Sequence, residues 1–256
     1  WRLSLMIKIR IIPRLDIKND TVVKGIHLEG LRVVGKPGEM AYEYYRQGAD
    51  ELLYMDAVAS LYERNSLTEI IKKAAKRIFV PLTVGGGIRK LEDISDTLNS
   101  GADKVAINTA AIRNPEFIRE ASVKYGSQCI VLSVEAKKTT SGWIAYTETG
   151  REPSKYNVLE WIPQAIKLGA GEVLLTSVDT DGTKGGFDTD LIKAVASICS
   201  VPLIVCGGAG SSDDILNLFN SVSIEAAAVG TGLHYEHFTI NQVKTLLGRH
   251  QIKVRH

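Results

Sequence analysis

Short apolar runs alternate along this chain with longer stretches in which apolar positions recur every three or four residues. Short runs rich in β-branched residues are typical of buried strands, whereas the spacing of three and four is typical of amphipathic helices. The pattern predicts eight strands, at 11–17, 51–55, 80–84, 104–107, 128–134, 172–176, 201–205 and 226–229. It predicts helices between most of them, for example at 37–47, 66–76, 91–100 and 114–125.

Regular alternation of strand and helix indicates a parallel sheet covered by helices. The 256 residues match the roughly 250 that are typical of eight strand–helix units closed into a barrel. No linker or shift in composition divides the chain. We therefore expect the α/β class and a single (β/α)8 TIM barrel over residues 1–256. Residues 1–5 precede Met6, which resembles a natural start, and are given no functional weight.

Self-similarity within the sequence predicts that the barrel consists of two related halves. The segment GADELL at 48–53 returns as GAGEVL at 169–174, which is 121 positions later. At the same shift PLTVGGG at 81–87 returns as PLIVCGG at 202–208. A repeat this long corresponds to half a barrel rather than to a solenoid. The halves are expected at about 6–125 and 126–256, although chance similarity is the alternative.

Composition favours a small-molecule enzyme of the cytoplasm. The chain has 31 Lys and Arg against 29 Asp and Glu, without a long run of one sign, so we expect neither a nucleic-acid nor a membrane partner. Three scattered cysteines do not form a disulfide framework, and the five histidines do not form a metal-ligand cluster. No apolar run approaches the length of a membrane span. We expect no metal and no cofactor.

Glycine-rich turns after the strands predict phosphate binding. Glycines let the backbone approach a ligand, and the free N–H groups of a following helix favour an anion. Gly87 and Gly208 occupy equivalent positions in the two halves, and Gly230–Thr231 and Asn108–Thr109 follow the eighth and fourth strands. The two sets predict a ligand with a phosphate at each end. Glycines that only relieve crowding at tight turns are the alternative.

Two carboxylates, Asp16 and Glu135, are predicted at the ends of strands one and five, on opposite sides of the barrel mouth. Such a pair divides acid and base work if the environments separate the two pKa values. Lys24 follows strand one and is expected on a loop that closes over the ligand. Asp181 and Gly182 follow strand six, where they bind polar ligand groups or form an ordinary turn. Solvated loop residues are the alternative for each charged group.

Five segments together strongly resemble the cyclase subunit of imidazole glycerol phosphate synthase, from about residue 6 to residue 255. They are RIIPRLD at 10–16, VKG at 23–25, TVGGGI at 83–88, GADKV at 101–105 and LTSVDTDGTK at 175–184. The resemblance implies an enzyme that takes ammonia from a glutaminase partner. It implies a bisphosphorylated ribulosyl aminoimidazole carboxamide nucleotide as substrate, which is split and closed into an imidazole ring.

The resemblance also implies roles for individual residues. Asp16 would be an acid or base, Lys24 the lysine of the first loop, and Thr176 and Asp181 part of the mouth. The implied phosphate contacts are Gly87, Asn108, Thr109, Gly208, Gly230 and Thr231. At the amino-terminal face of the barrel, where the glutaminase subunit would form a heterodimer with it, the family has a charged ring that gates ammonia. The corresponding residues are Arg10, Glu51, Lys104 and Glu172, for which a surface ion-pair network is the alternative.

Four positions depart from the family pattern. Glu135 stands where the family has Asp, which moves the carboxyl group by roughly 1 Å, a displacement that costs on the order of 10²-fold where geometry is tight. Arg14 replaces a small residue or Cys, Cys206 replaces Ser, and Thr180 stands where Arg is common. These departures leave three competing functions: a paralogue that channels ammonia for amidation of a surface sugar, a sugar-phosphate isomerase of the sister family, and a non-catalytic scaffold for a glutaminase.

Overall fold

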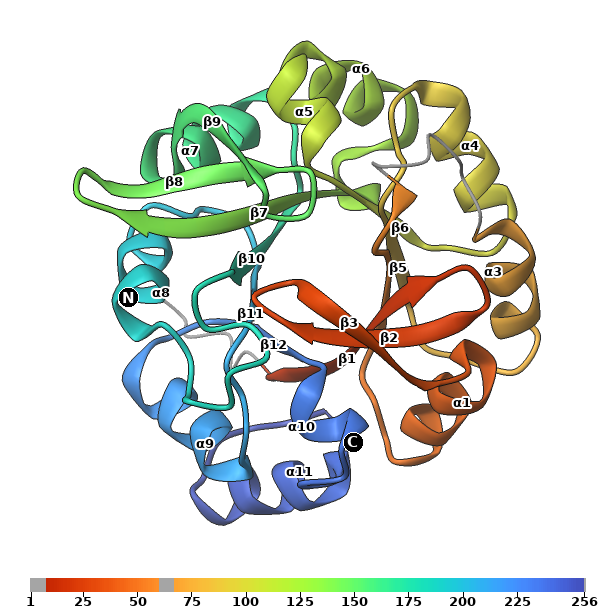
Figure 1. The fold of residues 1–256 in the computed structure, drawn as a ribbon, viewed down its shortest axis with the longest axis vertical. Helices are drawn as coiled ribbons and strands as arrows, with labels where there is room; N and C mark the ends of the chain where they lie inside the picture. Colours follow the sequence, from red (N-terminus) through yellow and green to blue (C-terminus); the bar gives the residue numbers. More distant parts are fainter. Residues whose placement is uncertain (1–7, 60–66, 256) are drawn as a thin grey trace, which may run out of the picture.

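Eight parallel strands close into a barrel in the computed structural model, which describes residues 8–59 and 67–255 (Figure 1). Each strand pairs with the next in chain order, and the last pairs with the first. In order around the barrel they are β1 (Arg10–Lys18), β4 (Leu52–Asp56), β5 (Leu82–Gly85), β6 (Lys104–Ile107), β7 (Ile130–Thr139), β10 (Glu172–Ser177), β11 (Leu203–Cys206) and β12 (Ala226–Val229). The predicted (β/α)8 barrel is confirmed.

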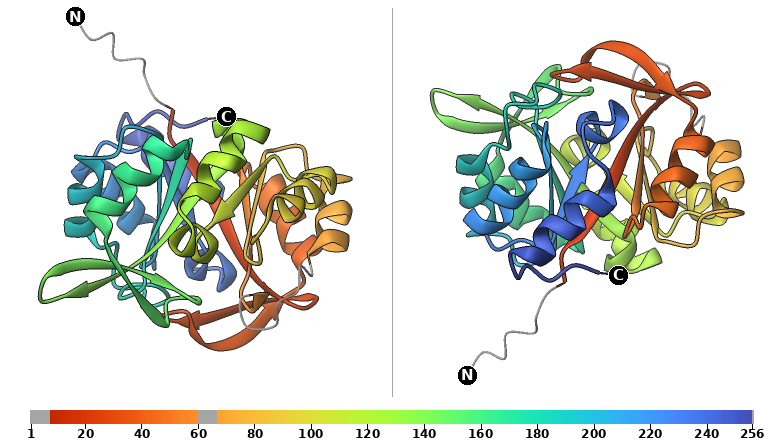
Figure 2. Two further views of the ribbon diagram at one scale, coloured as in Figure 1. Left: turned by 90° about the horizontal axis from the view of Figure 1, so that it is seen from above. Right: turned by 90° about the horizontal axis from the view of Figure 1, so that it is seen from below.

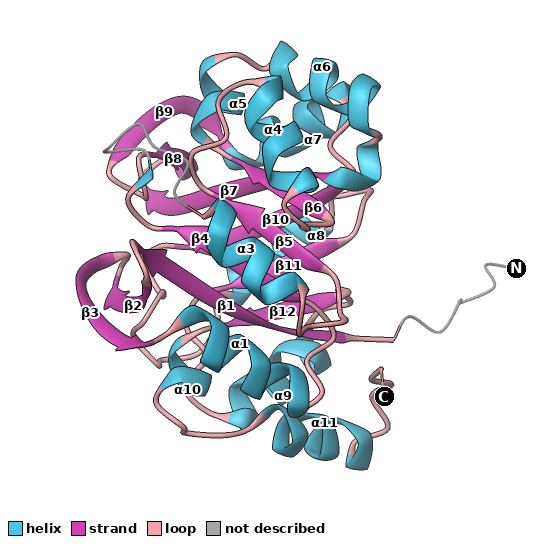
Figure 3. Ribbon diagram, turned by 90° about the vertical axis from the view of Figure 1, so that its right-hand side faces the viewer, coloured by secondary structure: helices cyan, strands magenta, loops and turns pink. Residues whose placement is uncertain are grey.

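Helices form a ring around the strands in the view down the barrel (Figure 1) and cover them in the side view (Figure 3). They are α1 (Pro37–Arg46), α3 (Thr68–Ala75), α4 (Leu91–Asn99), α5 (Thr109–Arg113), α6 (Glu116–Tyr125), α7 (Val158–Leu168), α8 (Thr189–Ala196), α9 (Ser212–Ser221), α10 (Thr231–His234) and α11 (Ile240–Arg249), with a 3-10 turn at Ser127–Cys129. Each longer helix buries one apolar face, as the spacing predicts; α7, for example, buries Trp161 and Ala165 against the barrel. None of the helices in the described ranges is long and apolar enough to cross a bilayer.

Two antiparallel hairpins extend the barrel at the carboxyl ends of its strands. Strand β1 continues into β2 (Thr21–Ile26) and β3 (Glu29–Gly35), and β7 continues into β8 (Gly142–Thr147) and β9 (Glu152–Asn157). Both hairpins lie at one end of the barrel, and the C-terminal segment lies at the other (Figure 2). Because β1 and β7 are the first and fifth strands of the barrel, the hairpins occupy corresponding places in its two halves.

Successive side chains of β1 alternate between an outer core, which lies between the strands and the helices, and an axial core inside the barrel. Ile11 and Leu15 point outward and pack against the helices. Ile12 points inward, into a smaller apolar core on the barrel axis that also contains Leu53 and Ile204. Because successive side chains of a strand alternate, Arg14 and Asp16 share the inward face with Ile12. This alternation places both charged groups above the axial core.

Candidate active site at the mouth of the barrel

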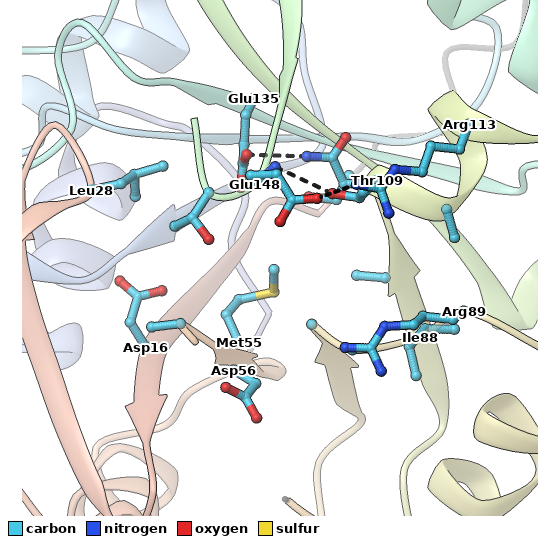
Figure 4. A pocket seen from close by; sticks show the side chains of 18 of the residues that line it. Asp16, Leu28, Met55, Asp56, Ile88, Arg89, Thr109, Arg113, Glu135 and Glu148 are labelled. Atoms are coloured by element: carbon cyan, nitrogen blue, oxygen red, sulfur yellow. Dashed lines mark hydrogen bonds and ion pairs between the residues drawn. The ribbon is translucent and has the colours of Figure 1, made fainter. Parts of the chain in front are cut away.

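A cavity of about 540 Å³ opens at the carboxyl ends of the strands. Asp16 and Glu135 line it from different sides, and Met55 also belongs to its lining (Figure 4). Six of the residues predicted at the mouth line this cavity: Asp16, Lys24, Gly87, Asn108, Thr109 and Glu135. Neither carboxylate ends its strand, contrary to the prediction, because β1 and β7 both run on into their hairpins.

Asp16 is held between two cations. Its Oδ1 atom accepts a hydrogen bond from Nε of Arg14 at 2.8 Å, and its Oδ2 atom accepts one from Nζ of Lys24 at 3.2 Å. The side chain is buried. Burial opposes ionisation, but the two neighbouring cations outweigh it and lower the pKa of Asp16 to about 2. Asp16 is therefore an anion throughout the neutral range.

Within the residues that the structure describes, the hydrogen-bond donors to Glu135 are uncharged. Its Oε2 atom accepts bonds from the Gly150 backbone amide at 2.7 Å and from Nδ2 of Asn108 at 3.1 Å. Burial raises the pKa of Glu135 to about 7, although Arg14 and the Gly150 amide oppose the rise. The two carboxyl groups thus have separated pKa values, which is the arrangement that lets one group exchange protons while the other stays charged.

Lys24 is not on a loop, so that prediction is wrong. The residue lies in β2, and its side chain is buried beneath the hairpin. Its Nζ atom is 2.8 Å from Oδ2 of Asp181 and 3.2 Å from Oδ2 of Asp16. A buried ammonium group needs such partners to remain charged, and these carboxylates raise the pKa of Lys24 although burial opposes them. Lys24 therefore joins two carboxylates under the hairpin.

The first of the two predicted phosphate sites is open to the cavity. Gly86 and Gly87 have φ values of 89° and 75°, and a Cβ atom at Gly86 would lie 2.6 Å from the carbonyl oxygen of Asp56, so this turn requires glycine. Arg89 and Arg113, which the sequence pattern does not single out, also line the cavity near this turn. Arg113 pairs at 2.8 Å with Glu148, which lies between β8 and β9 in the neighbouring hairpin. An arginine just after a glycine turn was the signal available in the sequence.

The second predicted phosphate site is covered. The described part of the chain does not place six predicted mouth residues in the lining of the cavity, namely Thr176, Asp181, Gly182, Gly208, Gly230 and Thr231. The β2–β3 hairpin lies over this half: the His27 amide donates to the Asp181 carbonyl at 2.8 Å, and Gly182 packs against the Gly25 carbonyl. Gly207 and Gly208 nevertheless repeat the positive φ values of the first turn, at 103° and 106°.

A closed ring of four ion pairs stands at the opposite, amino-terminal end of the strands. Arg10 contacts Glu51 at 2.7 Å and Glu172 at 2.8 Å, and Lys104 contacts the same two carboxylates at 3.1 Å and 2.7 Å. Burial opposes the charges, but Arg10 and Lys104 lower the pKa of Glu51. The four predicted ring residues are therefore brought together, each cation bridging both carboxylates.

Comparison with known proteins identifies the family. The profile of the histidine biosynthesis proteins matches residues 10–239. The chain is 54% identical to imidazole glycerol phosphate synthase subunit HisF of Legionella pneumophila over 210 residues, which cover 82% of this chain and 99% of that protein. This chain belongs to the HisF family. The HisF subunit of Helicobacter hepaticus is 48% identical, over 96% of this chain and 98% of its own. The HisF subunit of Streptococcus sanguinis is 45% identical, over 98% of this chain and 100% of that protein.

Two of the four positions that were expected to depart from the family pattern, Arg14 and Cys206, contact each other. Arg14 lies 3.5 Å from the Cys206 sulfur atom, and Glu135 shares the cavity with Arg14. Thr180 donates to the Gly207 carbonyl at 3.2 Å in the covered half of the mouth. These four positions therefore lie at the mouth of the barrel, and the four ring residues carry the charges that the resemblance implies.

Proposed function

We propose that this chain is the cyclase subunit of imidazole glycerol phosphate synthase and acts in histidine biosynthesis. Its similarity to HisF subunits over most of its length supports this function. The observation that carries the chemistry is the pairing of Asp16 and Glu135 across one cavity with pKa values of about 2 and about 7. A ring closure that also breaks a bond needs proton transfers near neutral pH, and Glu135 is suited to them.

The proposed reaction joins ammonia to a ribulosyl aminoimidazole carboxamide nucleotide that carries two phosphates. The adduct then splits and closes, giving imidazole glycerol phosphate and aminoimidazole carboxamide ribonucleotide. One phosphate would bind the Gly87 turn and the start of α5 at Asn108–Thr109, beside Arg113. The other would bind at Gly208 and Gly230–Thr231 after the hairpin moves away from the turn that contains Asp181.

Ammonia would come from a glutaminase subunit docked at the amino-terminal face. The ring of Arg10, Glu51, Lys104 and Glu172 lies at that face and encircles the entrance to the barrel axis. In this proposal the ring opens when the partner delivers ammonia. The heterodimer, its position and the gating role all follow from the family, and the closed geometry of the ring supports them.

The decisive experiment supplies the ribulosyl nucleotide with ammonium salts and purified protein, without a glutaminase. A cyclase forms both products under these conditions. If neither product appears but the protein stimulates a glutaminase, the cyclase proposal fails and the paralogue that serves another acceptor replaces it. Because Glu135 and Arg14 both alter the mouth, that paralogue is the second candidate. Rescue of a histidine auxotroph gives the same answer in cells.

A further inference from the structure

An arginine lies inside the barrel, where small and branched apolar side chains usually pack. Arg14 is on the inward face of β1, two residues after Ile12 of the axial core and two before Asp16. Only 4% of its side chain is exposed. Taking a guanidinium group out of water is costly unless its donors are satisfied. The hydrogen-bond partners of Arg14 therefore indicate why the barrel interior holds a guanidinium group at this position.

The guanidinium group bridges distant strands. Its Nε atom donates to Oδ1 of Asp16 at 2.8 Å, on the same strand, while Nη1 donates to Oγ1 of Thr176 at 2.9 Å. Thr176 is on β10, which is separated from β1 by β11 and β12 in the order of the barrel. The side chain thus crosses the interior, and its planar group is fixed at both ends.

This bridge decides how Asp16 is presented to the cavity. Arg14 takes one oxygen of the carboxylate and Lys24 takes the other, so neither oxygen is free of a cation. Protonation of Asp16 would remove the charge that pairs with both cations in a buried site. Glu135 differs, because no hydrogen bond or ion pair joins it to a cation in residues 8–59 and 67–255, and the Asn108 and Gly150 donors both contact the same oxygen, Oε2.

We propose that Arg14 is a positioning residue that holds the Asp16 carboxylate as an anion in one orientation, which leaves proton exchange with the substrate to Glu135. This inference deepens the proposed cyclase function and rests on it for its catalytic part. Asp16 then stabilises positive charge on the reacting nitrogen without moving a proton. Arg14 acts through Asp16 and does not itself need to touch the substrate.

Several other titratable groups face this pair and enter any measurement of its titration. Asp181, in the turn after β10, contacts Lys24, and its charge contributes to the raised pKa of Glu135. Cys206, on β11, contacts Arg14. His234, on α10, is close enough for its protonation to depend on Asp16, and burial lowers its pKa to about 4, so it is neutral when Glu135 titrates.

The first test measures titration directly and needs no substrate. Carboxyl carbons of Asp and Glu are labelled with ¹³C, and the two signals are assigned with Asp16→Asn and Glu135→Gln. We expect Glu135 to titrate near pH 7 and Asp16 to stay ionised above pH 4. In Arg14→Met, which removes the charge at similar length, the pKa of Asp16 should rise by at least about one, a tenfold gain in proton affinity. An unchanged Asp16 titration in that variant would overturn the proposal.

The second test distinguishes the orientation of the Asp16 carboxylate from the positive charge of residue 14. Thr176→Val keeps both charges but removes the far anchor of the guanidinium group, and Arg14→Lys keeps the charge but not the planar fork. We expect each to lower kcat with ammonium salts about tenfold with little change in KM, and to leave Asp16 ionised. A residue that only fills space would change the melting temperature and leave kcat and its pH profile as they are, which would refute positioning.

The two tests also keep this inference apart from the cyclase proposal. If the wild-type protein makes no product, the cyclase function fails, and the ¹³C titration still decides whether Arg14 controls Asp16. If Arg14→Met does not fold, Thr176→Val decides the question, since a fall in kcat supports the positioning role and an unchanged kcat contradicts it. Lys72→Met, at an exposed lysine of α3, is the matched control for removal of a cation.

Discussion

Asp16 and Glu135 face each other across one cavity, and the pKa of the first is lowered to about 2 while that of the second is raised to about 7 (Figure 4). Both are buried acidic side chains on inward faces of barrel strands. The difference comes from their neighbours, which are cations for Asp16 and neutral amides for Glu135. The environment therefore gives similar side chains different protonation states at pH 7.

Asp16→Asn should abolish cyclisation and also destabilise the fold. Replacing a solvated carboxylate would cost little stability, but Asp16 is buried, and the substitution leaves Arg14 facing a neutral amide. Breaking a buried ion pair from one side costs about 3–5 kcal/mol. Because Lys24 keeps Asp181, we expect a loss near the lower end of that range in the free energy of unfolding, measured by urea titration. Asp20→Asn, at an exposed position, is the control and should change neither property. Retained turnover would remove Asp16 from the mechanism.

Glu135→Gln should change how the stability of the protein depends on pH. The folded state raises the pKa of this carboxyl from 4.5 to about 7, so the wild type loses stability as pH rises between those values. Glutamine keeps an oxygen that accepts the Asn108 and Gly150 hydrogen bonds and has no charge to bury. The difference between the free energy of unfolding of the variant and that of the wild type should therefore become more favourable to the variant as the pH rises. From pH 4 to pH 8 this difference should grow by roughly 3 kcal/mol.

Chemical denaturation at four or five pH values measures this trend. Glu160→Gln on α7, an exposed position, serves as the control and should show no such slope. A constant difference between Glu135→Gln and wild type across the range would show that Glu135 ionises normally in the folded protein.

Lys104→Met should uncouple glutamine hydrolysis from product formation. Without Lys104, Glu51 and Glu172 keep only Arg10 as a partner, and the ring loses two of its four contacts. In a complex with the glutaminase, we expect the ratio of product to hydrolysed glutamine to fall at least twofold. Turnover with ammonium salts should fall less than the glutamine-dependent rate. Equal losses in the two assays would mean that the ring has no role in ammonia transfer, and Lys72→Met is the control.

Thr109→Val should weaken binding at the open phosphate turn. The variant keeps the shape of the side chain and removes a hydroxyl group at the start of α5, and a hydrogen bond to a charged group is worth about 1.5–3 kcal/mol. We expect KM for the ribulosyl nucleotide to rise at least about tenfold, and inorganic phosphate to raise the melting temperature less than in wild type. Thr68→Val on α3 is the control. Equal stabilisation of wild type and Thr109→Val by phosphate would place the anion elsewhere.

The sequence predicts the barrel because its signals are local. Each barrel strand is a short apolar run, and the glycine turns repeat at a fixed distance, so both features are visible without tertiary contacts. The ring residues follow from the family resemblance, and the structure brings them together. Their position at the starts of strands fixes the end of the barrel on which they meet.

The hairpins and the environment of Lys24 were beyond sequence reasoning for a physical reason. Strand β3 is mostly exposed and has no apolar run, so periodicity gives it no strong signal. The burial of Lys24 depends on Asp16 and on Asp181, which is 157 positions away. Likewise, the family pattern marks Arg14 as unusual but cannot show that it reaches Thr176. Contacts between distant strands determine these features.

The ring and the Arg14 bridge bound the axial core at its two ends, and the core between them includes the hydrocarbon side chains of Ile12, Leu53 and Ile204. An ammonium ion entering this stretch would lose its hydration shell and gain no counter-ion, whereas uncharged ammonia loses far less. On the proposed ammonia route, the barrel interior would therefore discriminate by protonation state. It would favour the uncharged, nucleophilic form of the nitrogen and leave the proton at the entrance.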